Sequence, residues 1–348
     1  MADGLINLKD LTFQEQDALI ASLGEPAFRA KQIRDWLYRK NCCALSGMSN
    51  LSKPLREKLE ITHCADGLTT LQKRESKDGT IKYLFGLVGG QSVETVYIPE
   101  EKRRTVCVST QVGCKFSCAF CATGKQGFTR NLSIGEILNQ VIEVRRDPDA
   151  GEVTNVVFMG MGEPLDNLEA VAQAARILNA EDGFNIGGRK ITISTVGLPR
   201  QITKLGSYDL NANLAISLHA ANNETRTSLL PANKKFPVEE IMKACAGYPL
   251  KQGRKITMEV ILFDGVNDSP HDAKQMVRAL HKVQAKVNLI RFNPVGETEL
   301  RPSPRPKMSA FKEILENSGI DCTIRMSKGE DIDAACGQLK SEANIQPT

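Results

Sequence analysis

From about residue 104 onward, apolar runs that predict strands alternate with amphipathic stretches that predict helices. The predicted strands lie at 105–109, 153–159, 190–195, 212–218, 256–263 and 286–292. The predicted helices lie at about 133–146, 168–180, 199–206, 238–247, 270–283 and 307–318. Because parallel strands need crossover helices, six such units predict a parallel sheet. We therefore expect an α/β fold, an incomplete (β/α)6 barrel of the TIM type, with its chemistry at the carboxyl ends of the strands.

Residues 1–65 predict a small helical domain. Thr12 begins a capping box, Pro26 starts a second helix, and Ser52 precedes a third. The face of the second helix opposite its apolar side is basic, with Arg29, Lys31, Arg34, Arg39 and Lys40. A basic face of this kind is usually solvated, and an RNA contact is the alternative interpretation.

Residues 66–99 predict antiparallel strands. Asp78-Gly79 is a strong hairpin signal between two alternating runs, and 92–98 alternates like a half-buried strand. The expected division is a helical domain at 1–65, a strand extension at 66–99, and the barrel with its C-terminal segment at 100–348.

Composition limits the class of protein. Hydrophobic residues make up 41% of the chain, enough for a sizeable core, and no stretch approaches the ~20 apolar residues of a membrane span. The first ten residues carry an early acid and lack a long apolar run, so we expect no secretory signal and a cytoplasmic protein. The net charge of +4 permits a nucleic-acid partner without requiring one.

Three cysteines lie close together after the first barrel strand. Cys114, Cys118 and Cys121 form C-x3-C-x2-C, with Phe120 before the last cysteine, which is the radical S-adenosylmethionine signature. Three thiolates can hold three irons of a 4Fe–4S cluster, and the fourth iron then stays open for a small molecule. The alternative is zinc, which usually needs a fourth nearby Cys or His. Neither residue type occurs between Cys121 and His219, so zinc is the weaker interpretation.

The other seven cysteines fall into two groups. Structural disulfides are unusual in the cytosol, and free cysteine commonly acts as a small buried hydrophobe. We interpret five as structural: Cys42, Cys43, Cys64, Cys245 and Cys322. The remaining two are Cys107 and Cys336.

Polar residues end several of the predicted strands. Residues 160–164 read Gly-Met-Gly-Glu-Pro, in which glycines allow close backbone approach and Glu163 offers a carboxylate to an amine. Ser194 ends the third strand, 217–219 (Ser-Leu-His) ends the fourth, and Asn293 follows the sixth. For His219, a hydrogen-bonded core histidine is the alternative.

Together these features resemble the radical S-adenosylmethionine RNA methyltransferases of the RlmN and Cfr type, and RlmN more closely. The resemblance runs over nearly the whole chain. The segments that carry it are 93–99, 107–114, 114–121, 127–132, 160–164, 217–220, 291–294 and 329–339. One departure follows residue 220, where the family more often has proline and this chain has Ala221-Asn222-Asn223, which predicts a less rigid loop.

The resemblance implies roles for individual residues. It implies Cys336 as the cysteine that becomes S-methylated, Cys107 as the thiol that frees it through a transient disulfide, and Glu94 as proton acceptor. An ordinary outward-facing carboxylate is the alternative for Glu94. Cys114, Cys118 and Cys121 would hold the cluster. S-adenosylmethionine would be bound by Gly162, Glu163, Ser194, Ser217, Leu218, His219 and Asn293.

The same resemblance implies the substrate and partners. The expected reaction is methylation of carbon 2 of adenosine in 23S ribosomal RNA, free or in early assembly, and in some tRNAs, with two S-adenosylmethionine molecules per turnover. The helical domain would then clamp RNA. A flavodoxin- or ferredoxin-type electron donor, no membrane and a monomer are also expected. The alternatives are a Cfr-type carbon-8 methyltransferase, a radical activase of another protein, and a non-enzymatic iron–sulfur or zinc sensor that binds nucleic acid.

Overall fold

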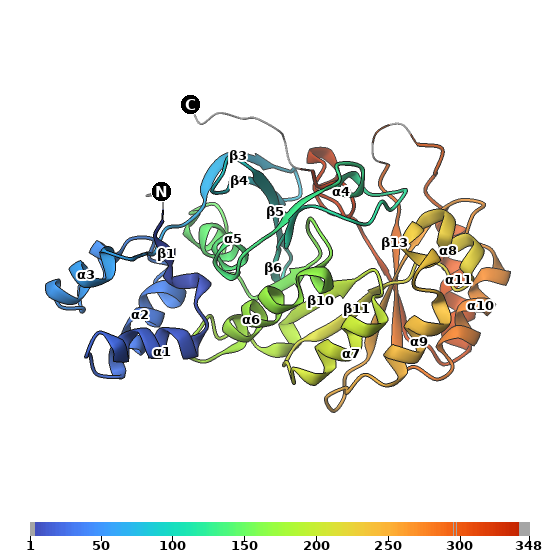
Figure 1. The fold of residues 1–348 in the computed structure, drawn as a ribbon. Helices are drawn as coiled ribbons and strands as arrows, with labels where there is room; N and C mark the ends of the chain where they lie inside the picture. Colours follow the sequence, from blue (N-terminus) through green and yellow to red (C-terminus); the bar gives the residue numbers. More distant parts are fainter. Residues whose placement is uncertain (1–3, 295, 297, 341–348) are drawn as a thin grey trace.

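The computed structural model describes residues 4–294, 296 and 298–340, so the two ends of the expected domain division lie outside it. Its main sheet has ten described strands (Figure 1). Seven are parallel and run in the order β14 (Cys322–Arg325), β13 (Ala285–Arg291), β12 (Ile256–Leu262), β11 (Asn213–Ser217), β10 (Ile191–Thr195), β9 (Asn155–Phe158) and β6 (Arg104–Cys107).

The six predicted strand–helix units are confirmed. The crossover helices are α5 (Ile134–Arg146), α6 (Leu168–Asn179), α7 (Pro199–Ser207), α9 (Val238–Ala246), α10 (Pro270–Leu280) and α11 (Arg305–Asn317). Capping boxes begin α5 at Ser133 and α10 at Ser269. β14 was not predicted, because only Cys322 of its four residues is buried and it shows no apolar run.

Three antiparallel strands extend the same sheet beyond β6. They are β3 (Thr69–Glu75), β4 (Ile81–Gly86) and β5 (Ser92–Pro99). The predicted hairpin at Asp78-Gly79 is confirmed. The prediction of a half-buried β5 was wrong, since its first six residues are all buried. One side of β5 meets α5 through the Thr95–Gln140 hydrogen bond, and the other meets the C-terminal segment through Glu94 and Lys340.

The N-terminal helices α1–α3 lie at one end of the molecule and α8–α11 at the other (Figure 1). The bounds are α1 (Phe13–Ser22), α2 (Phe28–Arg34), a π-helical turn at Asp35–Arg39, and α3 (Lys53–Glu60). The predicted capping box at Thr12 is present. Arg34 was wrongly placed on the exposed basic face. It is 4% exposed, and its guanidinium donates to Phe13 O and Asp17, so it joins α2 to α1.

Several short elements position the loops. They are β1 (Ile6–Asn7), β2 (His63–Cys64), β7 (Gln111–Gly113), β8 (Phe128–Asn131), α4 (Ala122–Lys125), α8 (Asn223–Leu229), and short 3-10 helices at Leu8–Asp10, Leu45–Gly47, Pro164–Asn167, Gly188–Lys190, Pro231–Lys234 and Glu330–Ile332. Asn222, at the departure from the family pattern, caps α8 by accepting from Thr225 N. This cap orders the loop that was expected to be less rigid. No helix in the described part of the chain is long and apolar enough to cross a membrane.

Candidate active site

A pocket opens at the carboxyl ends of β9–β12, where the fold predicts chemistry. We call it the mouth pocket. Of the predicted site residues, it is lined by Cys114, Cys118, Cys121, Gly162, Glu163, Ser194, Ser217, His219 and Cys336. The barrel therefore brings the cysteine triplet together with most of the polar strand ends.

The three cysteines of the triplet surround one side of this pocket. Burial raises the pKa of Cys114 to about 12 and also raises that of Cys118, and the neighbouring thiols add to both shifts. A bound metal cation would favour the thiolate form of these cysteines. Among the described residues, no three ligands converge closely enough for a single metal ion.

Glu163 is buried at the pocket wall and held in a fixed orientation. Its Oε1 accepts from Leu165 N at 2.9 Å and its Oε2 from Val196 N at 2.8 Å. Burial raises its pKa to about 7 despite these hydrogen bonds. An amine that entered the pocket would favour the carboxylate form, so Glu163 is suited to bind one.

Two glycines before Glu163 let its loop pack closely against residues 108–111, which precede the cysteine triplet. A Cβ at Gly162 would lie 2.6 Å from Gln111 Cβ, and one at Gly160 would lie 2.7 Å from Val108 O. Gly162 also has φ +98°, which L side chains rarely adopt. These glycines serve close packing of two chain segments, and this packing aims Glu163 into the pocket.

The residues that end β10 and β11 reach different places. Ser194 and Ser217 line the mouth pocket, whereas the Leu218 side chain is fully buried in the core. His219 is both a pocket residue and a hydrogen-bonded core histidine. It lines the pocket, and its Nδ1 accepts from Ile261 N at 3.1 Å. Burial, with a contribution from Arg226, lowers its pKa to about 3, so its ring is neutral. It packs edge-on against Phe120 with centroids 4.7 Å apart.

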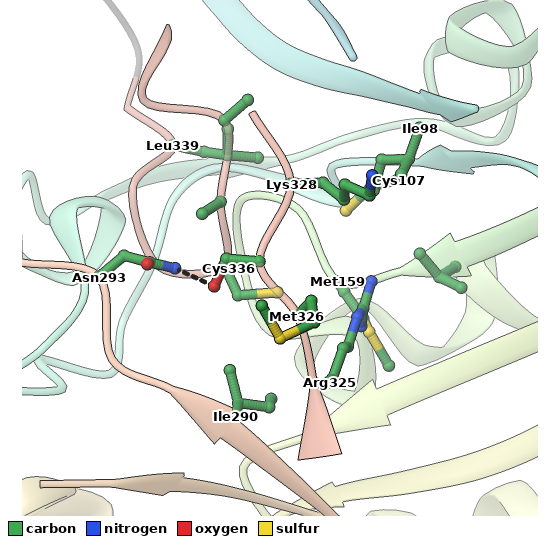
Figure 2. A pocket seen from close by; sticks show the side chains of 14 residues that line it. Ile98, Cys107, Met159, Ile290, Asn293, Arg325, Met326, Lys328, Cys336 and Leu339 are labelled. Carbon is green, nitrogen blue, oxygen red and sulfur yellow. Dashed lines mark hydrogen bonds between the residues drawn. The ribbon is translucent and has the colours of Figure 1, made fainter. Parts of the chain in front are cut away.

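A second pocket adjoins the first and contains both remaining cysteines (Figure 2). We call it the thiol pocket. Cys107 enters from the end of β6 and Cys336 from the C-terminal segment. Asn293 lines this pocket and not the mouth pocket, and its Nδ2 donates to Ser327 Oγ at 2.9 Å. Cys336 lines both pockets, so one thiol faces the cluster side and the Cys107 side.

The segment that carries Cys336 is fixed to the cluster loop. Ala122 N donates to Gly337 O at 2.7 Å, and Thr123 Oγ1 donates to Leu339 O at 2.6 Å. Gly337 has φ +86°, and a Cβ there would lie 3.1 Å from Phe120 O. This close approach explains a glycine directly after Cys336.

Glu94 is buried beneath the same segment, so an outward-facing carboxylate is excluded. It is 3% exposed; its Oε1 lies 3.0 Å from Lys82 Nζ, and its Oε2 accepts from Lys340 N at 2.8 Å. Glu94 does not line either pocket, although the segment above it carries Cys336.

Three charged residues of the site were missed by sequence reasoning. Arg325, on the unpredicted β14, lines both pockets, and the charges of Cys336, Glu259 and Cys107 raise its pKa. Glu259 on β12 lines the mouth pocket, and its buried Oε2 has no hydrogen-bond partner among the described residues. Arg226 is fully buried, and it donates to Leu218 O, Asn233 Oδ1 and Val196 O. A buried strand glutamate and an arginine in the last turn of a short helix carry no distinctive sequence signal.

Comparison with known proteins agrees with this geometry. Residues 108–279 match the Radical SAM superfamily, and residues 6–64 match the ribosomal RNA large subunit methyltransferase N-terminal domain. The dual-specificity RNA methyltransferase RlmN of Campylobacter fetus is 46% identical over 98% of this chain and 99% of its own length. RlmN of Syntrophobacter fumaroxidans is also 46% identical, over 96% and 98%.

A solved structure is similar over the same extent. The radical SAM methyltransferase from Sphaerobacter thermophilus superposes with a TM-score of 0.90, at 43% identity, over 96% of this chain and 99% of its own. The sequence relatives and the solved structure thus agree over nearly the full length. The chain belongs to the RlmN family of radical S-adenosylmethionine RNA methyltransferases.

Proposed function

We propose that this chain methylates carbon 2 of adenosine in 23S ribosomal RNA at the peptidyl-transferase centre, and of the adenosine next to the anticodon in some tRNAs. The observation that carries the proposal is the position of Cys336, which lines the mouth pocket and the thiol pocket together. A thiol placed between the two can accept a methyl group on one side and be released on the other.

The cofactors follow from the family, and the mouth pocket fits them. A bound 4Fe–4S cluster and S-adenosylmethionine supply the methyl group and the radical. Cys114, Cys118 and Cys121 are the cluster ligands in this proposal. Glu163 accepts from the amine, while Gly162, Ser194, Ser217 and His219 line the remaining wall. Leu218 can act only through its backbone, and Asn293 only from the thiol-pocket side.

Cys107 is the thiol that frees the product. Its thiolate attacks the sulfur of Cys336 and a disulfide forms. The carbon–sulfur bond to the RNA breaks with its electron pair going to the carbon, which takes up a proton and becomes the methyl group of the product. Burial raises the pKa of Cys107 to about 12, and the Arg325 guanidinium opposes that shift. Arg325 therefore favours the reactive thiolate at the place where the disulfide forms. All ten cysteines are free in the structure.

Glu94 is the proposed proton acceptor for the adenine ring. Its burial and its place beside the Cys336 segment support this role. Both carboxylate oxygens already have partners, Lys82 and the Lys340 N–H. Movement of the Lys340 end of the segment when RNA binds would open Oε2 to the adenine ring.

The N-terminal helices are the proposed RNA clamp, in a cytoplasmic, monomeric enzyme that takes electrons from a flavodoxin- or ferredoxin-type donor. Phe28 is 52% exposed with the Arg29 guanidinium over its ring, and Lys40 lies over Trp36. Phe28 is exposed and Trp36 is half-buried, and aromatic rings beside cations at the surface suit stacking with unpaired bases. The target adenine must leave its stack to reach the half-buried Cys336 thiol inside the pockets, so unpaired loops are suitable substrates.

A nucleoside digest tests the reaction. The anaerobically reconstituted enzyme is incubated with S-adenosylmethionine and with rRNA or tRNA that lacks the modification, and the digest is analysed by mass spectrometry. We expect 2-methyladenosine from both RNA classes. Production of 8-methyladenosine alone would assign the Cfr-type reaction, and a Cys336→Ala variant with full activity would favour a different radical enzyme. Zinc in place of about four irons in the purified protein would favour the sensor.

A second experiment tests the cysteine roles. In a Cys107→Ala variant the adduct between Cys336 and RNA forms but cannot be resolved. We expect a protein–RNA crosslink that intact mass assigns to Cys336. Turnover without any crosslink would remove Cys107 from the mechanism.

A further inference from the structure

One buried ion pair contacts both ends of the segment that carries Cys336. Lys82 Nζ lies 3.0 Å from Glu94 Oε1 and donates to Asp333 O at 3.2 Å. Glu94 Oε2 accepts from Lys340 N at 2.8 Å. Asp333 lies three residues before Cys336, and Lys340 lies four residues after it. The pair therefore closes the 333–340 segment as a loop over the β4–β5 strands.

This ion pair is more deeply buried than the ion pairs that Lys73 makes in the same hairpin. The side chains of Lys82 and Glu94 are 5% and 4% exposed, whereas Lys73 on the adjacent strand is 28% exposed where it pairs with Asp147 and Asp149. Surface pairs contribute little, but removing one partner of a buried pair leaves an uncompensated charge. Removal of either Lys82 or Glu94 would therefore leave the other as a buried unpaired ion.

The residues just before the 333–340 segment have additional contacts at the hairpin tip. Ser76 Oγ donates to Asp331 Oδ1, and Gly329 N donates to Asp78 Oδ2 at 3.1 Å. These contacts are partly exposed and lie before residue 333. These contacts join the chain before residue 333 to the hairpin, whereas the buried pair contacts the two ends of the part that contains Cys336.

We propose that Lys82 is a positioning residue for Cys336: paired with Glu94, it clamps the 333–340 segment so that the Cys336 thiol faces both pockets. Lys82 touches neither pocket, and it acts through Glu94 and the Asp333 carbonyl. This inference deepens the proposed function by assigning the residue that sets the geometry of its methyl-carrying thiol. It also gives Glu94 a second role, as the acidic half of the clamp.

Labelling of the thiols in the reduced, cluster-loaded protein tests the clamp. The protein is treated with N-ethylmaleimide in the absence of S-adenosylmethionine, and each cysteine is quantified over time by peptide mass spectrometry. In Lys82→Met we expect Cys336 to react on the order of tenfold faster, because the segment is released. Cys245 and Cys322, both buried in the core, should keep their wild-type rates and so report intact folding.

Three further variants make the test specific. Lys73→Met removes a lysine of the same hairpin outside the clamp and should leave the Cys336 rate unchanged. Lys82→Arg keeps the positive charge and should recover part of the protection. Lys82→Met/Glu94→Gln removes both charges, which leaves no buried unpaired ion, so it remains testable if the single variant unfolds. If the two residues act as a unit, the double variant labels no faster than Lys82→Met.

Two results would overturn the inference. An unchanged Cys336 rate in Lys82→Met or in the double variant would mean that other contacts hold the segment. Equal acceleration at Cys336, Cys245 and Cys322 would mean that Lys82 supports the whole fold. Labelling involves no methyl transfer, so either result stands whether or not the RNA product is 2-methyladenosine. The rate of Cys336 self-methylation gives the functional readout, and in Lys82→Met we expect it to fall on the order of tenfold.

Discussion

The mouth pocket and the thiol pocket share Cys336 and Arg325, but they are built differently. The mouth pocket is formed by the ends of successive parallel strands and by the cysteine loop, whose positions the barrel fixes. Half of the thiol pocket is formed by the C-terminal segment, which belongs to no sheet and is held by side-chain and turn contacts. Segments held in this way can open without disturbing the core.

The rigid mouth pocket and the less firmly held C-terminal segment suit two different requirements of the proposed reaction. Radical generation needs fixed geometry around the cluster, because a small displacement of reacting groups is costly. In the proposed reaction, the Cys336 thiol must reach the cofactor, the RNA base and Cys107 in turn. A clamped segment on a rigid barrel meets both requirements.

The largest effect on RNA methylation is expected from loss of a proposed cluster ligand, and it tests most directly whether the two pockets act separately. Cys118→Ala removes a proposed cluster ligand from the mouth pocket, so we expect loss of the cluster and undetectable RNA methylation. Cys336→Ala alters only the clamped side. It should bind iron normally and still cleave S-adenosylmethionine, but it should form no methylated RNA. Iron analysis and product mass spectrometry measure the two outcomes, and loss of iron in Cys336→Ala would contradict the separation of the pockets.

Arg325→Met should affect the thiol pocket next most strongly. Without the guanidinium, the pKa of Cys107 rises further and less thiolate is available. One pKa unit corresponds to about tenfold in thiolate. We expect release of RNA to slow by about tenfold and the Cys336–RNA crosslink to accumulate, as seen on denaturing gels. Lys328→Met, a nearby cation that lines the same pocket, is the matched control.

The pH dependence of S-adenosylmethionine binding tests the mouth pocket. The pKa of Glu163 is raised to about 7, above its ordinary value, so the free protein holds a proton there below pH 7. Binding of the amine favours the carboxylate and releases that proton. Affinity should therefore rise with pH between 6 and 7, by at most about tenfold per unit, and level off above. Calorimetry that finds the same pH profile in Glu163→Gln would remove this role.

The smallest effect is expected from loss of the Asn222 side chain, which caps the N-terminus of α8. Asn222→Ala removes the side-chain acceptor for Thr225 N. Loss of a helix N-cap typically costs about 1 kcal/mol of stability. Thermal unfolding should detect this decrease while S-adenosylmethionine affinity changes less than twofold. A large loss of affinity would show that the rigidity of the mouth pocket depends on this loop.

The strands and helices of the barrel could be predicted because the local sequence pattern of each one matches its burial in the folded barrel. Apolar strand runs and crossover helices gave the six units, and the spacing of Cys114, Cys118 and Cys121 gave the triplet. The failures lie where long-range contacts overrule local pattern. β5 is buried on both sides only because α5 and the C-terminal segment cover it, and Arg34 is buried only because α1 packs against it.

The sequence by itself determined the fold class, the cysteine triplet and the family resemblance, because spacing and periodicity are local properties of the chain. Only the tertiary structure decided that Arg325 lies beside Cys107 and Cys336, that Leu218 is buried away from the pocket, and that Lys82 and Glu94 close the Cys336 segment. Lys82 and Asp333 lie 251 positions apart in the chain. No local pattern encodes such a contact, because it exists only once the sheet has brought the hairpin and the C-terminal segment together.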